Sequence, residues 1–98
     1  YILPTGDKTG RGATTINHAY LQLRDCQFRN LLVVMKCFGG GRIDVIEPDE
    51  KGEYRDNSVG AYTQYSGLIM LMNGIPSTLG GTGNAIHGGA IVQDGKFI

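Results

Sequence analysis

The sequence between residues 31 and 47 is LLVVMKCFGGGRIDVIE. Its first half, Leu31 to Phe38, is a continuous apolar run rich in valine, which predicts a central buried strand. Gly39 to Gly41 supply a turn, because glycine adopts positive φ angles at little steric cost. In Arg42 to Glu47 the apolar residues alternate with charged ones, as expected for a strand with one buried face. This strand, glycine turn and strand together predict a fold built from short strands.

The rest of the chain has the same character. Glycine accounts for 16 of the 98 residues, more than twice its ordinary share, and it follows no Gly-X-Y period. Residues 13–24 fit one long strand, with a short helix over 17–23 as the alternative. Asp94-Gly95 is a two-residue hairpin turn. Further strands are expected at residues 53–55, 59–65, 67–72, 85–93 and 96–98.

No repeat of fixed period is visible along the chain. Seven or so short β segments without a convincing long helix indicate a mostly β protein. The sequence therefore predicts a single domain over residues 1–98, a small barrel or sandwich of short strands joined by glycine-rich turns.

The charged residues are unevenly distributed. Of the nine basic and nine acidic residues, all lie in residues 1–56 except Asp94 and Lys96, so residues 57–93 carry none. Interface cores are depleted in charge and enriched in tyrosine and methionine. We therefore expect part of this uncharged segment to form a subunit interface, although central strands and glycine loops are the alternative explanation. The candidate interface residues are Val59, Tyr62, Tyr65, Met70, Met72 and Ile75.

Composition also limits the function. A net charge of zero argues against binding to nucleic acid or to an anionic membrane surface, and the apolar stretches are too short to cross a bilayer. No zinc spacing or cofactor motif is present, so we expect no metal and no cofactor. The function expected is that of a non-enzymatic homo-oligomeric structural protein, a shell, capsid or fibre subunit, with its small-molecule ligand unknown. Because the chain begins at Tyr1, a cytoplasmic and a secreted location both stay open.

The two cysteines and a glycine-rich stretch suggest alternative functions. Cys26 and Cys37 could be bridged or reduced, and a bridge would suit a secreted binding module such as a toxin or effector. The glycine-rich stretch 80–89 lacks the dinucleotide-binding fingerprint, and turn formation alone would explain it. It could also form a backbone nest for an anion, in which the binding residues would be Gly81, Gly83, Asn84 and Gly88.

The second half of the chain resembles the vertex proteins of bacterial microcompartments. Residues 56–61 (DNSVGA) and 67–71 (GLIML) are similar to the acidic residue, the Val-Gly-Ala-Gly turn and the hydrophobic strand of that family. Residues 90–92 followed by Asp94 are similar to its last strand. Tyr62 departs from the family, because it stands where the second glycine belongs. The resemblance implies a small β-barrel that assembles into closed pentamers and has no catalytic residues.

A second resemblance is to the janus-type phosphohistidine phosphatases. Residues 37–43 (CFGGGRI) are similar to that family's Cys-Leu-Gly-Gly-Gly-Arg-Ile segment, and His18-Ala19 lies upstream where the family has its catalytic His-Ala-Asp. The acidic residue after His-Ala is missing here. The resemblance implies a small phosphatase or other hydrolase, in which His18 is the general base or phosphate carrier and backbone amides near Arg42 hold the phosphate.

Overall fold

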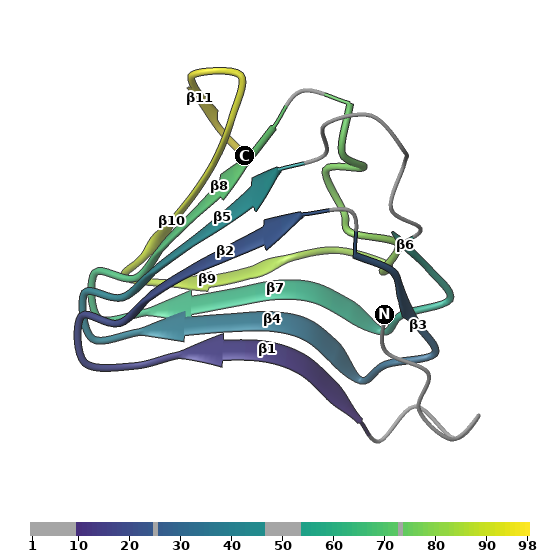
Figure 1. Ribbon diagram of the computed structural model, residues 1–98, viewed down its shortest axis with the longest axis horizontal. Coiled ribbons are helices and arrows are strands. Elements are labelled where there is room, and N and C mark those ends of the chain that lie inside the picture. Colours follow the sequence, from purple (N-terminus) through teal and green to yellow (C-terminus); the bar gives the residue numbers. More distant parts are fainter. Residues whose placement is uncertain (1–9, 25, 47–53, 73) are drawn as a thin grey trace.

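The structure, a computed structural model, describes residues 10–24, 26–46, 54–72 and 74–98. Over these residues the chain winds as a β-solenoid, in which strands far apart in the sequence lie side by side in successive coils (Figure 1). The expectation of a mostly β protein is confirmed. The expectation of a barrel or sandwich is wrong, because nearly all neighbouring strands are parallel and belong to stacked coils.

Two larger sheets form the long sides of the coils. They converge at the side of the molecule where short turns connect the strands of one sheet to those of the other (Figure 1). A short third sheet pairs β3 (Phe28–Arg29) with β6 (Tyr54–Arg55). The first sheet is parallel throughout and has the order β1 (Arg11–Thr15), β4 (Val33–Phe38), β7 (Val59–Gln64) and β9 (Ala85–His87). The second sheet has the order β2 (Tyr20–Arg24), β5 (Arg42–Ile46), β8 (Leu68–Leu71), β10 (Ala90–Gln93) and β11 (Lys96–Phe97), of which only β11 is antiparallel.

The coils do not have equal lengths, which hid the repeat in the sequence. The register pairs Arg11 with Val33, a step of 22 residues, and then Val33 with Val59, a step of 26. In the second sheet Leu68 pairs with Ala90, again a step of 22. Each step is long enough for the crossover that parallel strands require. A search for one fixed period therefore misses the repeat.

Tight turns join the first sheet to the second in each of the first three coils. In the middle coil the Gly41 amide donates to the Phe38 carbonyl at 3.0 Å, and the two residues between have positive φ angles. This is the pattern of a type I′ turn. The other two coils have the same hydrogen bond and positive φ angles, but the two central residues are Asn17-His18 and Tyr65-Ser66.

Because of these turns, the prediction of a single strand was wrong for two segments. Residues 13–24 form neither one strand nor a helix, because positive φ at Asn17 and His18 separates β1 from β2. Residues 85–93 are likewise divided into β9 and β10, with Gly88 at positive φ between them. The Asp94-Gly95 hairpin is confirmed, and both of its residues have positive φ.

The core lies between the two larger sheets. One inward row of the second sheet runs through Ile43, Ile69 and Ile91, which are almost completely buried, and it ends at the half-buried Leu21 in β2. The first sheet contributes Met35 and other residues of its inward rows. Since side chains alternate along a strand, the neighbours of this isoleucine row point away from the core. They form the outer face of the second sheet.

Candidate functional site

The outer face of the second sheet is divided into a polar and an apolar half. Residues paired in register lie on the same side of a sheet. The outward row that crosses all five strands begins with two polar residues in β2 and β5 and continues with three apolar residues in β8, β10 and β11. In order, its members are Gln22, Asp44, Met70, Val92 and Phe97.

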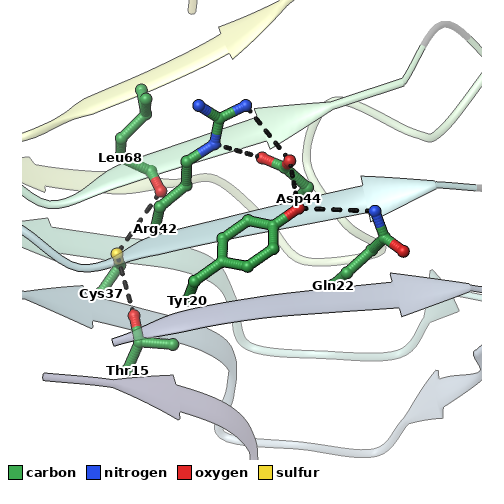
Figure 2. A network of polar contacts seen from close by, with 7 residues as sticks. All are labelled: Thr15, Tyr20, Gln22, Cys37, Arg42, Asp44 and Leu68. Carbon is green, nitrogen blue, oxygen red and sulfur yellow. Dashed lines mark hydrogen bonds and ion pairs between the residues drawn. The ribbon is translucent and has the colours of Figure 1, made fainter. Parts of the chain in front are cut away.

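A hydrogen-bonded network organises the polar half (Figure 2). Arg42 donates to both carboxylate oxygens of Asp44, from Nε at 2.7 Å and from Nη2 at 3.2 Å. The hydroxyl of Tyr20 donates to Oδ2 of Asp44 at 2.8 Å, and Gln22 Nε2 donates to the Tyr20 hydroxyl at 3.4 Å. The carboxylate thus accepts three hydrogen bonds from its own sheet.

The network shifts the titration of its members. Burial tends to raise the pKa of Asp44, but hydrogen bonds from Arg42 and Tyr20 outweigh this effect and lower it. The hydrogen bond to Asp44 in turn raises the pKa of Tyr20. An ionised carboxylate whose oxygens already accept three hydrogen bonds is a poor general base at neutral pH. The network is therefore better suited to fixing the surface than to catalysis.

The lowered pKa of Asp44 predicts an acid-dependent contribution to stability. Since the folded pKa lies below the unfolded one, this contribution is present above about pH 4 and is lost as the pH falls through the folded pKa. Chemical denaturation of wild type and Asp44→Asn between pH 7 and pH 2 should therefore give a difference in unfolding free energy that narrows in acid. A difference that does not change with pH would show that the carboxylate charge contributes nothing.

The apolar half exposes large side chains. Met70 and Val92 are half-buried, but Met72 is 47% exposed and Phe97 is 79% exposed. A shallow groove of about 190 Å³ lies at the boundary between the halves, with Arg42 and Asp44 on one side and the two methionines on the other. Small-molecule sites usually measure about 300–1,000 Å³. This groove is closer in size to a single protein side chain.

The candidate interface residues do not form one surface. Met70 and Met72 share the outer face of the second sheet. Tyr62 lies 4.7 Å from His87, ring centre to ring centre, on the first sheet, and Tyr65 is 71% exposed in a turn. Val59 is half-buried in β7, and Ile75 is buried in the core. Only the two methionines are brought together.

Sequence reasoning did not find Val92 and Phe97. Phe97 lies outside the uncharged segment, and its place beside Met70 depends on the β10–β11 hairpin and on the parallel pairing of β10 with β8. The Asp94-Gly95 turn indicated the hairpin, but nothing local to it indicates that β10 lies beside β8.

The residues considered for phosphate chemistry have other partners. His18 sits in a turn, its ring against Gly40, where an added Cβ would lie 2.6 Å from Nδ1. Arg42 is paired with Asp44, and within the described residues no hydrogen bond or ion pair joins it to His18.

The glycine-rich stretch is also internally bonded. The Gly81 amide donates to the Thr78 carbonyl at 3.0 Å, and Asn84 Nδ2 donates to the Ser77 carbonyl at 2.7 Å. The Gly83 carbonyl accepts from the Gly60 amide. The carbonyl of Gly88, in the turn between β9 and β10, accepts from the Ser66 amide. Two donors of the anion nest, which was the alternative to simple turn formation, therefore already form hydrogen bonds within the loop.

The two thiols are separate, so the Cys26–Cys37 bridge considered from the sequence is not formed. Cys37 is buried, where its sulfur accepts from Thr15 Oγ1 at 3.1 Å and its thiol donates to the Leu68 carbonyl at 3.4 Å (Figure 2). Cys26 is half-buried and donates to the Arg24 carbonyl at 3.3 Å. Each thiol has its own local partner.

Within the described ranges, no three His, Cys, Asp or Glu side chains are grouped so that they could hold a metal ion. A search of the same residues finds no helix long and apolar enough to span a membrane. Comparison with protein-family models, curated proteins and solved structures finds no match for the chain. The function proposed for it therefore rests on its own geometry.

Proposed function

We propose that this chain is a structural solenoid unit that self-associates laterally through the apolar half of the outer face, formed by β8, β10 and β11. The observation that carries the proposal is the division of one face of the second sheet into a polar and an apolar half. Protein interfaces commonly place apolar residues at the centre and polar residues at the rim. The Arg42–Asp44–Tyr20 network is positioned to form such a rim beside Met70 and Met72.

The hairpin strand β11 blocks end-to-end association at one edge of the second sheet, beside β10. Exposed edge strands are open to pairing with another chain, and proteins protect them with short, charged strands. Here β11 occupies the edge of β10, with Lys96 opposite Gln93 and the Ile98 amide donating to the Ile91 carbonyl at 2.9 Å. A second copy therefore cannot extend this sheet at β10 while β11 is in place.

The size of the face predicts weak association. The five strands contain between two and five residues each, and at about 4.8 Å between strands and 3.3 Å per residue they give a face of roughly 320 Å². That is less than half of the roughly 800 Å² per partner in a standard interface. We expect a dissociation constant between about 10 µM and 1 mM.

A pair of matched substitutions tests the proposal. Met72→Asp places a charge on the apolar half and should weaken self-association at least about tenfold, because the carboxylate must be desolvated. Thr14→Asp places the same charge on an exposed residue of β1 in the first sheet and should change self-association by less than about twofold. Both are measured by sedimentation equilibrium, with circular dichroism to confirm folding. Equal effects of the two substitutions, or none, would contradict an interface on the apolar half.

A further inference from the structure

We infer that the partner on this surface is a second copy related by a two-fold axis, with Phe97 of each copy inserted into the groove between β5 and β8 of the other. The inference rests on the proposed function and specifies its geometry. It follows from three features of the second sheet: an exposed aromatic side chain, a groove of matching size, and the shared row that sets their relative positions.

The exposed aromatic side chain is that of Phe97. It lies in β11 and is 79% exposed, the largest value among the large apolar side chains of the described residues. A buried phenylalanine removes about 150–250 Å² of surface from water, more than most other side chains in an interface. The pairing of Phe97 with Val92 fixes where its backbone lies relative to β10.

The groove has the dimensions and chemistry for an aromatic ring. Its volume is about 190 Å³, and a cavity of about 150 Å³ is large enough to hold benzene. Met70 and Met72 line one side, and methionine adapts its shape to aromatic rings and contacts them favourably. On the other side stands the Arg42 guanidinium, held in place by Asp44, which can pack on a ring face.

The register makes this contact reciprocal. Phe97 belongs to the same row as Asp44 and Met70, so it lies at the same height along the strands as the groove. Phe97 is two strand spacings, about 10 Å, from Met70. A two-fold axis parallel to the strands and above β10 therefore carries each Phe97 onto the other copy's groove. Such an isologous interface closes at two copies.

Filtered NOE spectroscopy on the unmodified chain tests this geometry. Copies labelled with ¹³C in the methionine methyl groups are mixed with unlabelled copies at about 1 mM, where the proposed affinity makes dimers abundant. We expect intermolecular NOEs from the Phe97 ring to the methyl groups of Met70 and Met72. Phe97→Ala should weaken dimerisation at least about tenfold, and Tyr65→Ala, in an exposed turn of another part of the coil, should leave it unchanged.

The outcomes separate this inference from the proposed function. If dimers form and Met72→Asp disrupts them, but no Phe97–methionine NOE appears and Phe97→Ala binds like wild type, the two-fold insertion is overturned and lateral association stands. If no association occurs at any concentration, both are overturned. Dimers with the expected NOEs support both.

Discussion

Replacing Asn57 with alanine is expected to destabilise the fold by about 2–4 kcal/mol. Asn57 is a buried polar residue that connects three segments. Its Oδ1 accepts from the Leu31 amide at 3.0 Å, and its Nδ2 donates to the carbonyls of Phe28 and Leu79 at 3.0 and 2.9 Å. Alanine would leave all three backbone groups without this partner in the interior, where each lost bond is costly.

Urea denaturation of three variants checks this expectation. Asn57→Asp keeps the shape and can still accept from Leu31, but it cannot donate to the two carbonyls, so it should be destabilised as well. Thr82→Ala removes an exposed hydrogen bond to the Ser58 carbonyl and should cost less than about 1 kcal/mol. A loss at Asn57→Ala no larger than the loss at Thr82→Ala would contradict the role given to Asn57.

Gly80→Ala is expected to cost about 3 kcal/mol or more. The φ angle of Gly80 is +74°, and a Cβ atom there would lie 2.3 Å from the carbonyl carbon of Tyr54 and 2.4 Å from the amide nitrogen of Arg55. Both obstacles are backbone atoms of the neighbouring coil, so a side chain cannot turn away to relieve the contact. The Gly80 carbonyl also accepts from the Asn57 amide at 3.0 Å, so a shift would disturb the same part of the structure.

Substitutions at two other glycines distinguish the cost of backbone strain from the cost of a steric clash. Gly95 has the same φ of +74° but nothing within 4 Å of an added Cβ, so Gly95→Ala should cost about 1 kcal/mol from strain alone. Gly83 has no positive φ and no neighbour within 4 Å of an added Cβ, so Gly83→Ala should be close to neutral. Thermal and chemical unfolding should rank the variants in this order. Equal losses at Gly80 and Gly95 would rule out the close approach of the two coils.

The sequence predicted individual strands better than their arrangement. The apolar run that contains β4, the glycine turn and the alternating residues of β5 are local patterns, and each matches the structure. The equivalent turn at Asn17-His18 has no glycine, so the chain there resembled one long strand. Coil stacking depends on pairing between residues 22–26 positions apart, and unequal steps leave no fixed period to detect.

The sequence also predicted only part of the candidate surface, because only some of its features are visible locally. The uncharged segment drew attention to Met70 and Met72, since a missing charge is visible in composition. Composition does not say which way a side chain points: Ile75, from the same segment, is buried at 3% exposure. Phe97 lies on this surface because of the register between β11, β10 and β8, which the sequence did not reveal. A surface that crosses five strands depends on how the strands pair, and local sequence does not contain that pairing.

Native mass measured by light scattering against concentration tests lateral self-association most directly. We expect a mass of 10.6 kDa at low micromolar concentration and a rise toward twice that mass as the concentration approaches about 1 mM, with no species larger than a dimer. A constant mass of one chain at all concentrations would contradict the association itself. Growth past two copies would contradict the closed two-fold geometry and indicate open-ended assembly instead.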